Sequence, residues 1–142
     1  MNRIGITFGC FDLLHSGHCL MLEEAKSDCD VLIVGLQSDP TIDRPDSKNK
    51  PIQTMYERFI HLMSISGVDM IVPYQTEAEI EEILSTLPIN VRYIGEDYVG
   101  KPFTGKQLCE DLGIEIIYTS RKHNFSTTQL RKRVKEAETK ND

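Results

Sequence analysis

Two histidines and two glycines are concentrated near the start of the chain, in the segment GCFDLLHSGH at residues 9–18. His15 and His18 are two of the four histidines in the sequence. As metal ligands they lack a third Cys, His or Glu nearby, so we expect no metal held by the protein here. As core residues they would be unusual, because both flank a glycine at an expected turn. Since phosphoryl transfer needs donors where negative charge develops, we interpret the pair as donors to a phosphate.

Gly9 and Gly17 suit a phosphate site that follows the first apolar run. Gly9 has no Cβ, so its backbone can approach a ligand closely. Gly17 lies near the expected start of the first helix, where unpaired N–H groups and the helix dipole favour an anion. The sequence therefore predicts an anion site at this turn, with both histidines on the same side of it.

A second anion site is predicted in the segment RKHNFSTTQL at residues 121–130. Ser126, Thr127 and Thr128 bring hydroxyls and free N–H groups to the start of the last expected helix, and Arg121 lies just upstream. Helix capping by Ser126 alone is the alternative, but it explains one hydroxyl and not three in a row. We expect this segment to hold the remaining phosphates of the same ligand.

The segment QSDPTIDRPDSKNKPIQ at residues 37–53 has three prolines among polar residues, which excludes a regular element. The prolines and the missing loop glycine also exclude a calcium-binding loop. A loop of this length in a compact domain is usually functional or mobile. Its cations Arg44, Lys48 and Lys50 suit an anionic substrate, and a solvated surface loop is the alternative.

Short β-branched runs alternate with helical stretches, and this order must position both anion sites. Strands are expected at residues 3–8, 31–37, 69–74, 91–95 and 114–119. Apolar stripes of helical period cover 17–27 and 55–66. Capping boxes mark helix starts at Thr54–Glu57, Thr76–Glu79 and Ser126–Gln129. The order β-α-β-α-β-α-β-α-β-α predicts an open α/β fold with a five-stranded parallel sheet and helices on both faces, in one domain over 1–142 with a frayed end at 132–142.

The composition limits the partners and the compartment. A net charge of -6 and a pI near 5.2 provide no basic field for a nucleic acid, so we interpret RKRVKEAETK near the end as a solvated helix face. No stretch approaches the roughly 20 apolar residues of a membrane helix, and MNRIGITFG is not a signal peptide. The four cysteines have no C-x-x-C spacing, so we expect reduced thiols in the cytoplasm.

These motifs resemble those of the nucleotidyltransferase superfamily that includes the cytidylyltransferases. GCFDLLHSGH is similar to its H-x-G-H signature, and NFSTTQL is similar to its second signature at the start of the last helix. IGEDY at residues 94–98 resembles the G-D-D-W stretch of glycerol-3-phosphate cytidylyltransferases. The resemblance implies a Rossmann-like fold, transfer of a nucleotidyl group from a nucleoside triphosphate to a small phosphorylated acceptor with release of pyrophosphate, Mg²⁺ with the triphosphate, and a homodimer.

The resemblance also implies roles for individual residues. The residues expected to act on the transferred phosphate and the leaving pyrophosphate are His15, His18, Arg121, Ser126 and Thr127. The nucleotide site would be completed by Gly9, Cys10, Phe11, Gly17, Gly95, Asp97 and Thr128. The acceptor would be bound by Lys48, Lys50 and Arg58. Asp12 is expected to hold the loop and not to act as a base.

Three departures leave the nucleotide and the acceptor open. Cys10 stands where the glycerol-phosphate enzymes have threonine, and Glu96 and Tyr98 replace the aspartate and tryptophan of G-D-D-W. Cys10 and the phrase RPDSKNKPIQTMYER are similar to heptose-phosphate adenylyltransferases. We expect CTP and glycerol 3-phosphate or a similar polyol phosphate. The alternatives are ATP with a heptose phosphate or a flavin nucleotide, and a nucleotide-binding regulator without catalysis.

Overall fold

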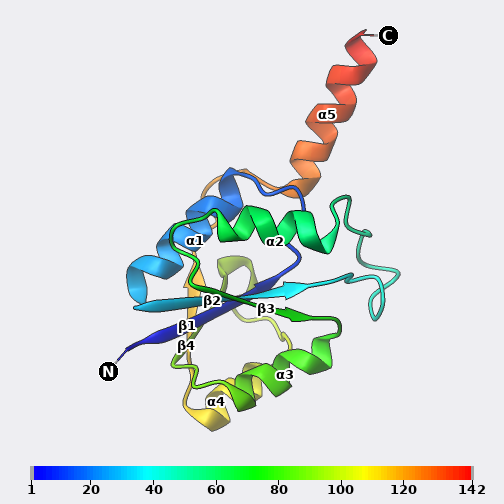
Figure 1. The fold of residues 1–142 in the computed structure, drawn as a ribbon. Coiled ribbons are helices and arrows are strands. Elements are labelled where there is room, and N and C mark those ends of the chain that lie inside the picture. The colour runs from blue at the N-terminus through cyan, green and yellow to red at the C-terminus, as the bar shows by residue number, and fades with distance from the viewer. Residues whose placement is uncertain (1, 142) are drawn as a thin grey trace.

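A parallel sheet of five strands in the order β3-β2-β1-β4-β5 forms the centre of the molecule (Figure 1). The computed structural model describes residues 2–141. The strands are β1 (Ile4–Gly9), β2 (Val31–Gln37), β3 (Met70–Tyr74), β4 (Val91–Gly95) and β5 (Glu115–Thr119). The helices are α1 (Ser16–Asp28), α2 (Met55–Met63), α3 (Glu77–Thr86), the short 3₁₀ helix η1 (Glu96–Tyr98), α4 (Lys106–Leu112) and α5 (Thr127–Asn141). The predicted Rossmann-like fold class is confirmed.

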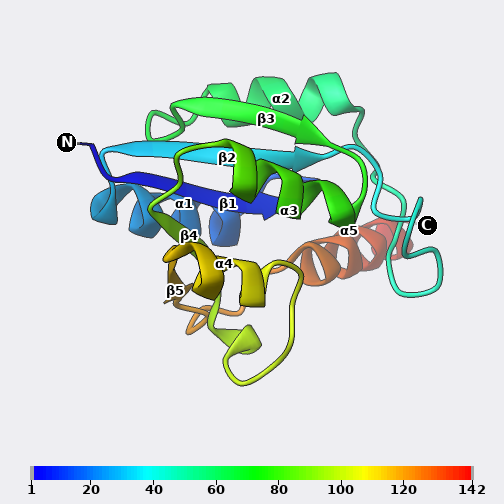
Figure 2. The ribbon, with the colours of Figure 1, turned by 90° about the horizontal axis from the view of Figure 1, so that it is seen from below.

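Helices cover both faces of the sheet. The chain steps outward from β1 to β2 and β3, then returns to place β4 on the other side of β1. Because parallel crossovers are right-handed, this reversal puts α1 and α2 on one face and α3 and α4 on the other (Figures 1 and 2). Loops after β1 and β4 therefore diverge, and they leave a crevice at the carboxyl ends of these strands.

Two apolar clusters fix the sheet between its helices. One lies under α1 and α2 and includes Leu22, Val34 and Leu62, which are all fully buried. The other lies under α3 and α4 and is built around Ile6, Ile33, Ile80 and Leu84. The central strands β1, β2 and β4 are largely buried as a result, which is why their sequences are nearly continuous apolar runs and do not alternate. The edge strands β3 and β5 keep exposed residues.

All three helices begin directly after the residue that the capping-box pattern predicted, namely Thr54, Thr76 and Ser126. Thr54 and Glu57 form both hydrogen bonds of the box. Ser126 Oγ accepts from the Gln129 N–H at 3.0 Å, which is the capping half of the pattern. Thr76 is the N-cap of α3 as predicted, but its side chain makes no capping bond, and the Glu79 carboxylate accepts from the N–H of Gln75 in place of that of Thr76.

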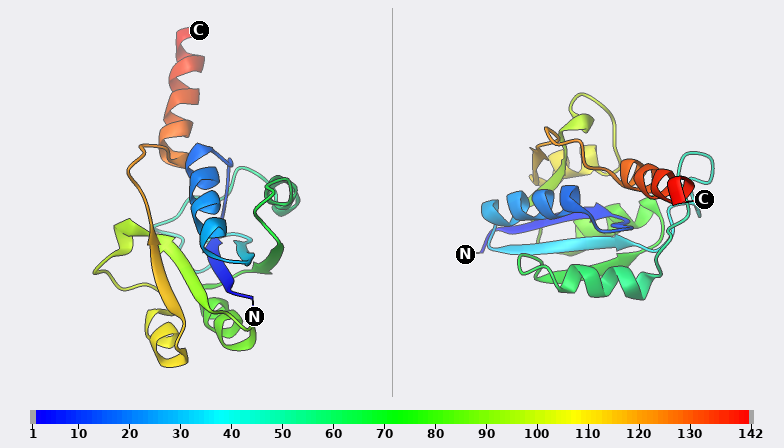
Figure 3. Two further views of the ribbon diagram at one scale, coloured as in Figure 1. Left: turned by 90° about the vertical axis from the view of Figure 1, so that its left-hand side faces the viewer. Right: turned by 90° about the horizontal axis from the view of Figure 1, so that it is seen from above.

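Helix α5 projects from the body of the domain (Figure 3). Its described backbone is helical as far as Asn141, which includes most of the segment 132–142. Fraying of that segment stays a prediction, and residue 142 lies outside the described chain. Within residues 2–141, no helix has the length and apolar character needed to cross a membrane.

Candidate active site

His15 and His18 cap helix α1 reciprocally. His15 directly precedes the helix, and its Nδ1 accepts a hydrogen bond from the Gly17 N–H at 3.0 Å. The Nδ1 of His18 accepts from the His15 N–H at 3.2 Å, and the two rings stack with centroids 3.9 Å apart. Because each Nδ1 is an acceptor, the proton of each neutral ring is on Nε2. Each histidine therefore keeps one Nε2–H donor for a ligand.

Burial keeps these imidazoles uncharged. Burial is the main reason why the pKa of His18 falls to about 3, and the nearby charges of His15 and Arg121 lower it further. Burial also lowers the pKa of His15, with contributions from His123 and Arg121. At neutral pH both rings are neutral donors, which suits them to stabilise negative charge that develops on a phosphoryl group.

The loop between β1 and α1 is held in a strained conformation beside His18. Phe11 and Leu13 have φ values of 52° and 51°, a region that non-glycine residues rarely adopt. Phe11 is buried with its ring 5.2 Å from that of His18, and the Leu13 N–H donates to the Gln53 side chain at 2.8 Å. Strain of this kind persists where the surroundings fix the backbone, and it is common at functional sites.

Gly17 allows a third histidine to approach the pair. A Cβ on this residue would lie 2.8 Å from Cε1 of His15 and 3.0 Å from Cε1 of His123. The Nδ1 of His123 accepts from the Phe125 N–H at 3.2 Å, and its Nε2 is buried without a hydrogen-bond partner. The sequence analysis missed His123, although it lies inside the segment 121–130. The signal would have been a histidine three residues before Ser126, within the predicted second anion site.

Asp12 joins the two predicted anion sites. Its carboxylate accepts from the N–H groups of Ile52 and Gln53, each at 2.9 Å, and forms an ion pair with Arg131 of α5 at 3.0 Å. The hydroxyl of Thr127 donates to the Asp12 carbonyl at 3.4 Å. The loop with the two histidines and the start of α5 are therefore neighbours, and Asp12 holds the loop as expected.

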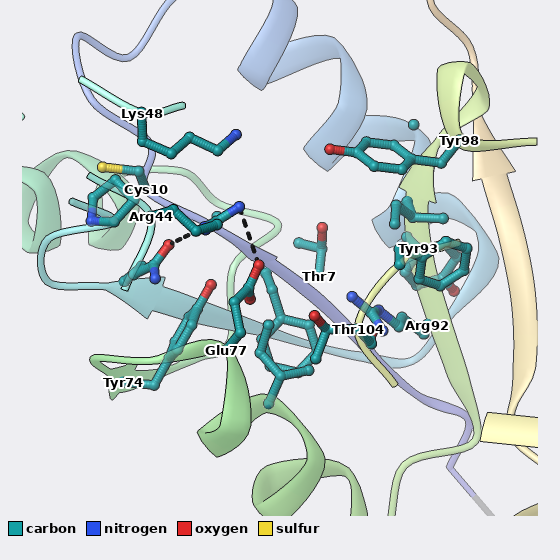
Figure 4. Close-up of a pocket in the computed structure, with 18 of the residues that line it drawn as sticks. Thr7, Cys10, Arg44, Lys48, Tyr74, Glu77, Arg92, Tyr93, Tyr98 and Thr104 are labelled. Carbon is teal, nitrogen blue, oxygen red and sulfur yellow. Dashed lines mark hydrogen bonds and ion pairs between the residues drawn. The ribbon is translucent and has the colours of Figure 1, made fainter. Parts of the chain in front are cut away.

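A cavity of about 470 Å³ lies at the carboxyl ends of β1, β2 and β4 (Figure 4). This volume is in the range of small-molecule sites. The predicted residues among its lining are Gly9, Cys10, Lys48, Gly95 and Arg121. Burial raises the pKa of the Cys10 thiol, so at neutral pH Cys10 lines the cavity as an uncharged group.

Arg121 connects this cavity to the histidines. It lines the cavity, and its charge is close enough to lower the pKa of His15 and His18. Its Nε lies 3.4 Å from the Asp97 carboxylate, and its backbone N–H donates to Glu96 at 2.7 Å. A Cβ on Gly95 would lie 2.5 Å from that Nε, so only glycine leaves room for this arrangement.

The three cations predicted for the acceptor are placed differently from one another. Lys48 lines the cavity, whereas Lys50 is exposed and is not part of the lining. Arg58 is 2% exposed and donates to the carbonyls of Cys10 at 3.0 Å, Gln37 at 2.6 Å and Ser38 at 2.7 Å. The expected acceptor contact of Arg58 is therefore replaced by a positioning role, because its guanidinium is buried and bonded to the loops after β1 and β2.

Arg44, one of the loop cations predicted to suit an anionic substrate, lines the cavity together with polar side chains that were not singled out in the sequence. Arg44 donates to the Gln37 side chain at 3.1 Å and forms an ion pair with Glu77 at 3.0 Å (Figure 4). Tyr74 and Thr7 lie along the same cavity. These residues come from four separate elements, so no local motif in the sequence marks them as a group.

A parallel α/β sheet with an H-x-G-H turn joined to a Ser-Thr-Thr helix start defines a nucleotidyltransferase domain. The chain belongs to the cytidylyltransferase-like family, whose model matches residues 6–133. The bifunctional protein HldE of Paramagnetospirillum magneticum is 34% identical over 133 residues, which cover 94% of this chain and 27% of that protein. HldE of Nitrobacter winogradskyi is 37% identical over 131 residues, which cover 92% and 27%. The chain thus spans about a quarter of the length of these relatives.

Solved structures share the fold at lower identity. The lipopolysaccharide core biosynthesis protein of Thermoplasma volcanium has a TM-score of 0.66 at 24% identity, covering 84% of this chain and 96% of that chain. The pantoate-beta-alanine ligase of Francisella tularensis has a TM-score of 0.59 at 24% identity, covering 94% and 69%. At these identities the likeness is one of fold.

Proposed function

We propose that this protein transfers a nucleoside monophosphate from a nucleoside triphosphate to a small phosphorylated acceptor and releases pyrophosphate. The observation that carries this proposal is the joining of two donor clusters through Asp12. The neutral rings of His15 and His18 lie on one side of it, and the start of α5 lies on the other. Together they offer donors along the length of a triphosphate.

The acceptor attacks without help from a general base. An oxygen of the acceptor phosphate forms a bond to the α-phosphorus, and the bond from the α-phosphorus to the bridging oxygen breaks. Pyrophosphate leaves with that electron pair. Because the attacking oxygen is already anionic, the protein must hold the groups in line and offset their repulsion. His15 and His18 donate to the α-phosphate, and Arg121 with Ser126, Thr127 and Thr128 holds the leaving phosphates.

ATP with a sugar phosphate is the substrate pair that we propose first. Two observations support this pair: the similarity of the chain to the HldE proteins, and the resemblance of Cys10 and of residues 44–58 to heptose-phosphate adenylyltransferases. CTP with glycerol 3-phosphate is the second candidate, favoured by the likeness of residues 94–98 to G-D-D-W. In either case Gly95 would contact the nucleotide, because it lines the cavity beside Arg121. Asp97 would act next to it through its ion pair with Arg121 at 3.4 Å.

Mg²⁺ is proposed to arrive on the triphosphate. Among residues 2–141, no group of three or more His, Cys, Asp or Glu side chains is placed to hold a metal ion. Mg²⁺ needs no such cage, since it commonly keeps several waters and binds through substrate phosphates. When bound, it would neutralise charge on the triphosphate.

A pyrophosphate-release assay tests the proposed function. ATP and CTP are each combined with a heptose phosphate, another sugar phosphate and glycerol 3-phosphate. We expect release that requires both a triphosphate and an acceptor, with ATP and a sugar phosphate as the best pair. A rise in melting temperature on addition of a triphosphate, without pyrophosphate release from any pair, would instead indicate a nucleotide-binding regulator.

A homodimer in the cytoplasm is part of the same proposal. Helix α2 exposes Tyr56, Phe59, Ile60 and Met63, which form an apolar surface suited to a second copy. All four cysteines are unpaired, as a reducing compartment requires. Light scattering should give twice the mass of the chain, and Tyr56→Lys should shift the protein toward the monomer.

A further inference from the structure

Arg92 is a buried cation on the wall of the cavity. It lies in β4, is 4% exposed, and contributes to the cavity lining together with Phe8, Phe103 and Thr104. Its guanidinium carbon is 5.0 Å from the ring centroids of both Phe8 and Phe103. Figure 4 shows Arg92 beside Thr104, on the opposite side of the cavity from Tyr74. The two rings hold the guanidinium in one place and partly offset its burial.

In the described chain Arg92 forms no ion pair with a carboxylate; Cys109 and the more distant charge of Glu77 are among the groups that favour its charged form. The guanidinium donates to the carbonyl of Thr104, and its Nε is buried without a hydrogen-bond partner. The other two arginines of the cavity are paired, Arg44 with Glu77 at 3.0 Å and Arg121 with Asp97 at 3.4 Å. Burying a charge without an ion-pair partner carries a large desolvation penalty, so an arginine used only for packing is disfavoured here.

Arg92 is also far from the place where the chemistry is proposed. It pairs in register with Ile6, three residues before the end of β1 at Gly9. At about 3.3 Å per residue, its backbone lies roughly 10 Å down the sheet from the turn with the histidines. The guanidinium is held there between Phe8 and Phe103, so a ligand group bound to it is assigned to a different part of the acceptor from the attacking phosphate.

We propose that Arg92 binds a second anionic group of the acceptor, a carboxylate or a phosphate, at the end remote from the attacking phosphate. The planar fork of a guanidinium matches both groups. Thr7, Gln37 and Tyr74 also line the cavity and suit the hydroxyls of a sugar. The acceptor class is thus a phosphorylated sugar acid or a sugar bisphosphate. This inference rests on the proposed function, because it takes the cavity as the acceptor site.

Calorimetric titration with three matched probes tests the inference. Glucose 1-phosphate has a neutral remote end, glucuronate 1-phosphate adds a carboxylate, and glucose 1,6-bisphosphate adds a phosphate. Each is titrated into the full chain, with and without α,β-methylene ATP. We expect at least one charged probe to bind about tenfold or more tightly than glucose 1-phosphate. Comparison of glucuronate 1-phosphate with glucose 1,6-bisphosphate then identifies whether a carboxylate or a phosphate is preferred. Equal affinities for all three probes, or binding of none, would overturn the inference.

Variants separate a specific contact from general attraction to a cation. Arg92→Gln should abolish the preference for a charged remote end and leave the affinity for glucose 1-phosphate and the ATP analogue unchanged. Lys106→Gln is the matched control, because it removes a cation 5.7 Å from the same Phe103 ring but outside the cavity lining. A preference that survives in Arg92→Gln, or that is lost equally in Lys106→Gln, would overturn the inference. The comparison of probes on the unmodified protein decides it if Arg92→Gln does not fold.

The same titrations distinguish this inference from the proposed function. Failure of α,β-methylene ATP and of CTP to bind would count against nucleotidyl transfer, whatever the sugar probes do. Binding of the nucleotide analogue together with equal affinities for the sugar probes would leave nucleotidyl transfer standing and remove the role of Arg92.

Discussion

Asp12 and Arg131 lie 119 residues apart in the sequence, and an ion pair of 3.0 Å joins their side chains. Asp12 is in the loop that follows the first strand, and Arg131 is in the first turns of the last helix. The same carboxylate accepts two backbone N–H groups from the segment that precedes α2. One buried acid thus holds three separate segments around the candidate active site, and the site depends on it although Asp12 takes no part in the proposed chemistry.

Replacement of Asp12 by alanine should therefore destabilise the fold. The N–H groups of Ile52 and Gln53 and the Arg131 guanidinium would lose their acceptor, at a cost of about 3 kcal/mol of unfolding free energy. Urea unfolding measures this change. Asp46→Ala is the control, because Asp46 is an exposed carboxylate in the loop before α2. Equal stability of the two variants would show that the contacts of Asp12 are unimportant.

Two substitutions of His15 should separate its capping role from its donor role. In His15→Asn the side-chain oxygen takes the place of Nδ1, so the cap to Gly17 is kept and the Nε2–H donor is lost. We expect near-normal stability and a fall in kcat of about 100-fold or more. In His15→Gln the terminal amide takes the place of Nε2, so a donor is kept and the cap to Gly17 is lost. The free energy of unfolding should therefore fall by about 1 kcal/mol, and kcat should fall less than in His15→Asn. A larger loss of kcat in His15→Gln than in His15→Asn would show that the contribution of His15 to catalysis comes from its cap and not from its Nε2–H donor.

His18 should make stability dependent on pH. In the unfolded chain a histidine binds a proton below about pH 6.5, whereas the native pKa of His18 is about 3. The unfolded state therefore binds more protons in this window, and unfolding free energy falls as the pH drops from 6.5, by up to about 1.4 kcal/mol per unit from this residue. His18→Asn should show a shallower slope between pH 6 and pH 4.5 in urea unfolding. Identical slopes would mean that native His18 titrates normally.

The strands and most helix starts were predictable because their causes are local. The run at 31–37 coincides with β2, since a strand covered on both faces must be continuously apolar. The box at Thr54–Glu57 likewise depends on neighbours in the sequence. The reciprocal capping by His15 and His18 is also local, but it was not predicted, because histidine is not one of the usual N-cap residues.

Contacts between distant segments were not predictable. Arg58 was expected in the acceptor site because the family resemblance implied it. Its partners are carbonyls of Cys10, Gln37 and Ser38, which no spacing reveals. A signal was present nonetheless, because Arg58 precedes buried Leu62 by four residues and so lies on the inner face of α2.

Gly95→Ala should weaken nucleotide binding without unfolding the protein. The backbone of Gly95 has a φ of -61°, which alanine adopts readily, so stability should change by less than about 1 kcal/mol. The new Cβ would displace Arg121, whose Nε lies 2.5 Å from that position, and the KM of the triphosphate should rise about tenfold. Arg121→Gln should raise it similarly, and the double variant should add little. Additive effects would show that Gly95 does not act through Arg121.

Arg58→Lys tests the role that replaces the expected acceptor contact. Lysine cannot reach three carbonyls from one planar group, so buried acceptors after β1 and β2 lose their partner. The free energy of unfolding should fall by about 3 kcal/mol. At a low temperature, where the variant is still folded, the KM of the acceptor should stay within about a factor of two, because only small backbone shifts reach the acceptor site. Lys50→Gln, at an exposed position of the same loop region, should leave stability unchanged. Normal stability of Arg58→Lys together with a raised acceptor KM would return Arg58 to the acceptor site.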